Sequence, residues 1–103
     1  MKNLTESNYN ELKDKNVVFV DFWASWCGPC MMMAPVFEKV ANIYQAKAEF
    51  MKSNIDEDQN LAVKFGINSI PTILAIKRGE VVDKHVGLTN ENVLTSFIER
   101  NLQ

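Results

Sequence analysis

The chain has 103 residues, of which 47% are hydrophobic and 23% are charged, which is the composition of one ordinary globular domain. A formal net charge of −2, with acidic and basic residues interspersed, argues against nucleic acid or a membrane as a partner. A domain of this length buries about two-thirds of the surface that its unfolded chain exposes, so its two cysteines are not needed as a scaffold.

The N-terminal segment gives no sign of export. Residues 1–6 lack the apolar core of a secretory signal, and no stretch of the chain reaches membrane-spanning length. We therefore expect a cytoplasmic protein. In that reducing compartment a cysteine pair is more often catalytic or metal-binding than a structural disulfide.

The first half of the chain predicts alternating strands and helices. A short edge strand is expected in the first few residues, and a short amphipathic helix over residues 7–13. Residues 17–23 are β-branched or aromatic almost throughout, which indicates a strand covered on both faces at the centre of a sheet. Apolar residues at helical spacing follow over about residues 27–46, where Pro35 is expected to produce a kink.

The second half predicts a strand over residues 50–55 and a short helix over residues 60–65, which Gly66 ends. Residues 72–76 and 81–86 form two strands whose spacing suits an antiparallel hairpin. Asn90 can cap a last helix, and the residues of this helix expected to face the sheet are Val93, Leu94, Phe97 and Ile98. This order predicts a single α/β domain over residues 1–103, with a mixed sheet and helices on both faces.

Cys27 and Cys30 lie three residues apart at the expected start of the long helix, close enough to form a disulfide. A complete tetrahedral zinc site needs further ligands, and the chain offers only His85, so a redox pair is favoured over a metal site. Unpaired N–H groups and the helix dipole would stabilise a thiolate at Cys27, the candidate nucleophile. Cys30, one turn deeper, fits the resolving role. Gly28 and Pro29 supply no cation between the cysteines, which favours a reductant over an oxidant.

The run over residues 20–30, followed by Ala34 and Pro35, resembles the active-site segment of the thioredoxin family. The likeness continues in order along the chain, at residues 52, 54–56, 66–67, 70–72, 79 and 86–87. It implies the thioredoxin fold, a central mixed sheet of roughly four to five strands flanked by about four helices. It also implies a protein-disulfide reductase without a bound cofactor or metal. Such a protein would act as a monomer on disulfide-containing proteins and be recycled by a separate thioredoxin reductase.

The resemblance also assigns supporting roles. Asp21, in an otherwise apolar strand, would be a buried acid of raised pKa that relays the proton of Cys30, with Lys52 close to it. A strand-end carboxylate in water and an ordinary solvated lysine are the alternatives from the residues alone. Pro71 would be cis and lie against the disulfide, which leaves the Ile70 backbone free to pair with an extended substrate; a trans turn proline is the alternative.

An apolar rim around Cys27 is expected to accept many extended disulfide segments, and its residues would be Trp26, Gly28, Ile70, Pro71, Gly87 and Leu88. Trp23 is expected to pack, and His85 is expected to be a surface or packing residue rather than a reactive one. Residues 31–33 are all methionine, where the family often carries lysine or arginine after the second cysteine. We expect these methionines to fill packing gaps in the helix.

Two other functions stay open at this point. The first is a disulfide oxidant or isomerase, against which the Gly28–Pro29 dipeptide argues, and which the reduction potential would distinguish. The second is a binding subunit of a larger assembly, in which the surface of the fold matters more than turnover. A double variant, Cys27→Ser with Cys30→Ser, would retain the activity of such a subunit.

Overall fold

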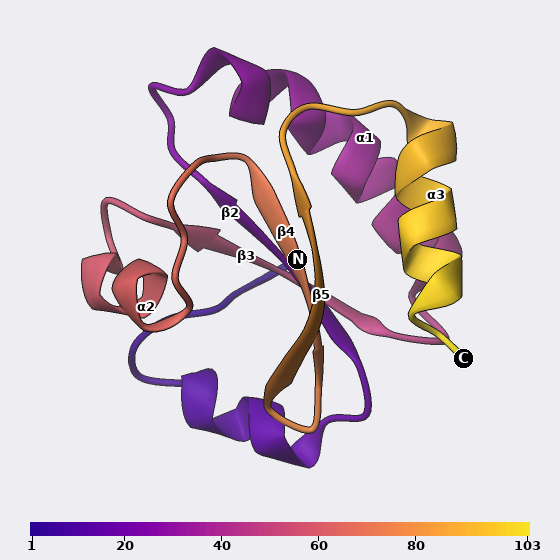
Figure 1. Ribbon diagram of the computed structural model, residues 1–103, viewed down its shortest axis with the longest axis horizontal. Coiled ribbons are helices and arrows are strands. Elements are labelled where there is room, and N and C mark those ends of the chain that lie inside the picture. Colours follow the sequence, from indigo (N-terminus) through magenta and orange to yellow (C-terminus); the bar gives the residue numbers. More distant parts are fainter.

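The computed structural model describes residues 1–103 and contains one five-stranded sheet with the order β1-β3-β2-β4-β5 (Figure 1). The strands are β1 (Lys2–Asn3), β2 (Val18–Trp23), β3 (Glu49–Asn54), β4 (Thr72–Lys77) and β5 (Glu80–Val86). Strands β1, β3 and β2 are parallel, whereas β4 runs antiparallel to both β2 and β5. The mixed sheet with β2 at its centre confirms the predicted thioredoxin fold.

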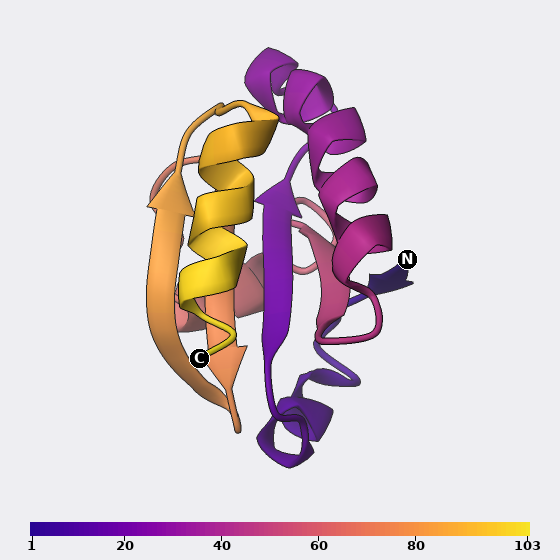
Figure 2. The same cartoon turned by 90° about the vertical axis from the view of Figure 1, so that its right-hand side faces the viewer.

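Helices cover both faces of the sheet, as the sequence predicts. Helix α1 (Gly28–Tyr44) and helix α3 (Glu91–Arg100) lie side by side on one face (Figure 2), and their buried residues form a core with Phe19, Phe50 and Ile73. The 3₁₀ helix η1 (Tyr9–Asp14) and helix α2 (Gln59–Lys64) cover the other face. No helix combines the length and the apolar character needed to cross a bilayer.

The central strand explains why its sequence is apolar without alternation. Phe19 belongs to the core on the side of α1 and α3, whereas Val18, Val20 and Phe22 belong to the core on the side of α2. Because successive side chains of a strand point to opposite faces, both sets are buried. Only one residue of this buried run is charged, and that residue is Asp21.

Local boundaries follow the predicted signals. The side chain of Asn90 accepts a hydrogen bond from the N–H of Val93 at 2.9 Å and so caps α3. Gly66 follows α2 with a φ of 66°, the left-handed conformation in which glycine commonly ends a helix. Helix α1 continues through Pro35 without a break.

Three details differ from the sequence-based expectations. The first helix is a 3₁₀ helix that begins at Tyr9, and only Leu12 within it is buried. Val93 is 45% exposed, because the buried stripe of α3 runs along Leu94, Phe97 and Ile98 and leaves Val93 at its edge. The hairpin turn has two residues rather than four, Arg78 and Gly79, and both have the positive φ of the turn that matches strand twist.

Candidate active site

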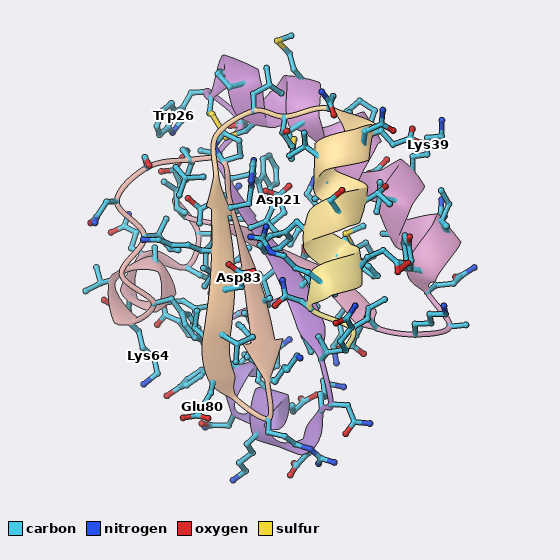
Figure 3. All side chains as sticks on the ribbon, turned by 45° about the vertical axis from the view of Figure 1, so that its right-hand side comes forward. Asp21, Trp26, Lys39, Lys64, Glu80 and Asp83 are labelled. Atoms are coloured by element: carbon cyan, nitrogen blue, oxygen red, sulfur yellow. A yellow bond between two sulfur atoms is a disulfide. The ribbon has the colours of Figure 1, made fainter.

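The two cysteines lie where the central strand gives way to the long helix. Strand β2 ends at Trp23 and α1 begins at Gly28, which makes Cys27 the N-cap residue of α1. Cys27 and Cys30 form a disulfide, and their Cα atoms are 5.2 Å apart. In Figure 3 the neighbouring Trp26 lies at the outer edge of the molecule, and Asp21 lies in the interior.

The two sulfurs have different surroundings. Cys27 is 6% exposed and Cys30 is 1% exposed. The backbone N–H of Cys30 donates a hydrogen bond to Sγ of Cys27 at 3.2 Å, and the first turn of a helix carries a partial positive charge. Both effects stabilise negative charge on the Cys27 sulfur once the disulfide is reduced.

Asp21 is completely buried, and neither of its carboxylate oxygens has a hydrogen-bond partner. Burial raises the pKa of Asp21 from 3.8 to about 6, although the charge of Lys52 acts in the opposite direction. Lys52 is the register partner of Asp21 in β3, and its ammonium lies 4.6 Å from the ring centroid of Trp23. The structure therefore brings Asp21 and Lys52 together, and a solvated strand-end carboxylate is the wrong interpretation.

The position of Asp21 along β2 places it under the start of α1. Asp21 alternates with Phe19 and Trp23 on one face of the sheet. Phe19 belongs to the same core cluster as Met33 of α1, and Trp23 packs against the cluster that contains Cys30. The buried carboxyl therefore lies between the main core and the disulfide.

The loop before β4 lies against the disulfide. The carbonyl oxygen of Ile70 is 3.9 Å from Sγ of Cys27, and Ile70 packs against the cysteine cluster. The Ile70–Pro71 peptide bond is cis, as the family resemblance implies, and Pro71 itself is buried. The N–H of Gly87 donates to the carbonyl oxygen of Pro71 at 2.8 Å, which fixes the next loop beside the first. Leu88 follows with 46% of its surface exposed.

Trp26 is 68% exposed, and its indole Nε1–H donates to Oδ2 of Asp56 at 2.8 Å. The sequence did not identify Asp56 as a site residue. The predicted topology could have indicated this contact, since residues that follow two neighbouring parallel strands meet at one edge of the sheet. Gly28 and Pro29 are both exposed, and a Cβ at Gly28 would contact nothing within 4 Å, so the space beside Gly28 is open.

The methionine run contradicts the packing expectation at two of its three positions. Met33 is fully buried, but Met31 is 49% exposed and Met32 is 64% exposed. The inward face of α1 carries Cys30, Met33 and Phe37, at spacings of three and four residues. The two residues between Cys30 and Met33 therefore point away from the core.

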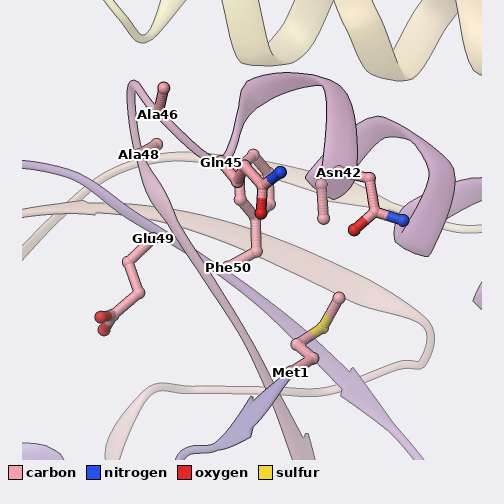
Figure 4. Close-up of a pocket in the computed structure, with 8 residues that line it drawn as sticks. Met1, Asn42, Gln45, Ala46, Ala48, Glu49 and Phe50 are labelled. Carbon is pink, nitrogen blue, oxygen red and sulfur yellow. The ribbon is translucent and has the colours of Figure 1, made fainter.

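Trp23 and His85 pack as expected. Trp23 is partly buried against the cysteine cluster, and the ring of His85 meets the ring of Phe97 edge-on at 6.1 Å between centroids. No three His, Cys, Asp or Glu side chains come close enough together to hold a metal ion. A surface pocket of about 450 Å³ lies near Met1 and the C-terminal end of α1 (Figure 4), at the opposite end of that helix from Cys27.

Comparison with known proteins gives a consistent result. A family model described as Thioredoxin matches residues 1–100. The chain is 48% identical over 100 residues to a thioredoxin of Chlorobaculum thiosulfatiphilum, covering 95% of this chain and 93% of that protein. A thioredoxin of Staphylococcus saprophyticus is 46% identical over 99 residues, or 96% and 95% of the two chains. "Thioredoxin 2" of Chlorobaculum tepidum is 45% identical over 100 residues, or 95% and 92%.

Asp21→Asn should stabilise the disulfide form at neutral pH. The unfolded carboxyl titrates near its ordinary pKa of 3.8 and the folded one at about 6, so the native state holds an extra proton between these values. The native chain therefore loses stability as pH rises through this range. Above the range the loss in the free energy of unfolding is about 3 kcal/mol, because each pKa unit corresponds to about 1.36 kcal/mol. Urea unfolding of both proteins at about pH 3, 5 and 8 measures this difference.

The test depends on how the difference in the free energy of unfolding between the two proteins changes with pH. A constant difference is not diagnostic, because the amide can also change stability by the same amount at every pH. The matched control is Asp14→Asn, which removes an exposed carboxylate and should give a gap that varies little with pH. An equal gap between the native chain and Asp21→Asn at all three pH values would contradict the assignment.

Proposed function

The chain belongs to the thioredoxin family and is a protein-disulfide reductase, and from that premise we propose that Cys27 is its nucleophile and Cys30 its resolving thiol. The asymmetry of the disulfide carries this assignment. Cys27 is the more exposed of the two residues and its sulfur accepts a helix N–H, whereas Cys30 is enclosed in the first turn of α1. A nucleophile needs access and a stabilised thiolate, and a resolving thiol needs only its neighbour.

In the first step the Cys27 thiolate attacks one sulfur of a substrate disulfide. A bond forms between Cys27 and that sulfur, the substrate S–S bond breaks, and the other substrate sulfur leaves as a thiolate that takes up a proton. The N–H of Cys30, which points at Sγ of Cys27 in the disulfide form, holds the attacking sulfur in place.

In the second step Cys30 loses its proton and attacks Sγ of Cys27. The mixed disulfide breaks, the second substrate sulfur leaves as a thiolate that takes up a proton from solvent, and two electrons have passed from the chain to the substrate. We assign Asp21 as the base that receives the Cys30 proton, directly or through one water, with Lys52 favouring its charged form. The support is a buried carboxyl without any hydrogen-bond partner on the side of the sheet that α1 covers.

The rim around Cys27 is the proposed substrate-binding surface. Backbone atoms of Ile70 would pair with an extended substrate, and Pro71 and Gly87 would hold that loop in place. Apolar contacts would come from Trp26 and Leu88, which are both exposed. Gly28 and the exposed Pro29 would complete the rim, and Gly28 has no side chain that would block an approach.

The partners follow from this chemistry. The substrates are proteins that contain disulfides, and a separate thioredoxin reductase returns two electrons to the Cys27–Cys30 disulfide. We place the cycle in the cytoplasm, where the thiol pool is kept reduced, and expect the chain to act as a monomer without nucleic acid or membrane.

Cys30→Ser should trap substrate, whereas Cys27→Ser should not. Without Cys30 the first step still occurs, but nothing resolves the mixed disulfide, so a covalent adduct at Cys27 accumulates. Each reduced variant is incubated with a disulfide-containing protein and analysed by mass spectrometry without reductant. Adducts on the Cys27→Ser variant in place of Cys30→Ser would reverse the two roles.

Asp21→Asn should slow the second step by about a hundredfold near neutral pH, the lower end of the usual gain from general base catalysis. The first step should keep its rate, because it uses Cys27 alone. Rapid quenching with acid measures the lifetime of the mixed disulfide in both proteins. In the native chain the second step should accelerate as pH rises through about 6, the pKa of Asp21, and this acceleration should be missing in the variant. Identical lifetimes and pH profiles would rule out the relay.

A further inference from the structure

Three of the segments around the disulfide carry no Asp, Glu, Lys, Arg or His. They are residues 22–37, 66–76 and 86–90. The first contains both cysteines, the second reaches them through the contact of Ile70 with Cys27, and a backbone hydrogen bond joins the third to the second. A substrate that approaches the Cys27 sulfur over these three segments therefore meets only apolar and neutral polar side chains.

Met31 lies on the same side of α1 as the reactive sulfur. Its N–H donates to the carbonyl oxygen of Cys27 at 3.1 Å, which places Met31 one helical turn after Cys27 on one face. Helical side chains lean toward the N-terminus of their helix, so the Met31 thioether is directed toward the turn that carries Cys27. Met32 has the same relation to Gly28, above which space is open.

These two methionines are available for contact. Met31 is 49% exposed and Met32 is 64% exposed, whereas Met33 and Met51 are almost completely buried. With Trp26, which is 68% exposed, they place exposed apolar side chains before and after the cysteine motif along the chain. Along the first turns of α1 the rim is thus wider than the cysteine motif alone would make it.

An acidic turn borders this rim beside Trp26. Asp56 accepts the hydrogen bond of the Trp26 indole, and Glu57 and Asp58 follow it in the same turn. Lys52 is half-buried, with its ammonium over the Trp23 ring, and faces the buried Asp21. The exposed cation of α1, Lys39, lies about two helical turns beyond Met31 and pairs with Glu91 at 2.8 Å. A negatively charged substrate would meet repulsion from the turn and no exposed cation on the rim.

We propose that Met31 and Met32 extend the docking rim along α1 and make it select disulfide segments with an apolar residue, rather than an acidic one, beside the reacting sulfur. This proposal rests on the proposed function, because it requires the substrate to reach Cys27 over this rim. Methionine suits the role, since its flexible and polarisable thioether adapts to side chains of different shape. Selection against acidic segments comes from repulsion and from desolvation of the carboxylate, not from a close fit.

The test uses three synthetic peptides that share one intramolecular disulfide and differ only in the residue beside one cysteine, which is leucine, glutamine or glutamate. Glutamine has the shape of glutamate without its charge. The second-order rate constant of reduction is followed by the fluorescence of Trp23 and Trp26 in the reduced chain. We expect the order leucine, glutamine, glutamate at low salt, and a smaller gap between the last two at about 0.5 M salt.

Met31→Lys should raise the ratio of the glutamate to the glutamine rate constant by about two- to fivefold, the effect of one exposed charge contact. The control, Ile43→Lys, adds the same charge to α1 at a position that is 61% exposed, about 18 Å farther along the helix, and should leave the ratio unchanged. Met31→Leu should preserve the native order. A ratio cancels any effect of the new charge on the thiolate itself, because that effect would change both rate constants equally.

Equal rate constants for all three peptides with the native chain would overturn the proposal while leaving the proposed function intact. A ratio that Ile43→Lys changes as much as Met31→Lys does would also overturn it, because net charge would then replace position as the cause. If the native chain reduced none of the peptides, the proposed function would fail, and the docking proposal with it.

Discussion

The hydrogen bond from the N–H of Cys30 to the sulfur of Cys27 is the interaction on which the site depends. It exists because α1 begins at Gly28, so that Cys27 takes the N-cap position and the first turn of the helix closes around its sulfur. That position in turn requires β2 to end at a fixed residue. Burial of this strand on both faces holds it in place. The core of the protein therefore determines the geometry of the reactive sulfur.

The same central strand contains a residue that opposes stability. Asp21 is buried without a hydrogen-bond partner, and an apolar side chain of similar size would satisfy the core better at that position. Lys52 reduces this cost only in part, because the effect of burial on the pKa of Asp21 is the larger one. An unfavourable buried group on the face of β2 that α1 covers is consistent with the proton-relay role proposed for Asp21.

The fold and the cysteine chemistry could be predicted because their signals are local. The apolar run of β2, the helical spacing after Cys27 and the spacing of the cysteines each lie within a few consecutive residues. The hydrogen bond between Trp26 and Asp56 could not be predicted in this way, because it joins residues that follow two parallel strands and depends on the register of those strands. The exposure of Met31 and Met32 could not be predicted either, because three consecutive methionines do not indicate which of them lies on the buried face of the helix.

The reduction potential of the Cys27–Cys30 couple tests the central claim most directly. The chain is equilibrated in thiol–disulfide buffers, and the fraction oxidised is followed through the fluorescence of Trp23 and Trp26. A protein-disulfide reductase must be able to give electrons to substrate disulfides, so we predict a potential more negative than about −220 mV, the upper limit found for a cytosolic glutathione pool. A potential well above that limit would contradict the account and indicate a protein that forms or rearranges disulfides.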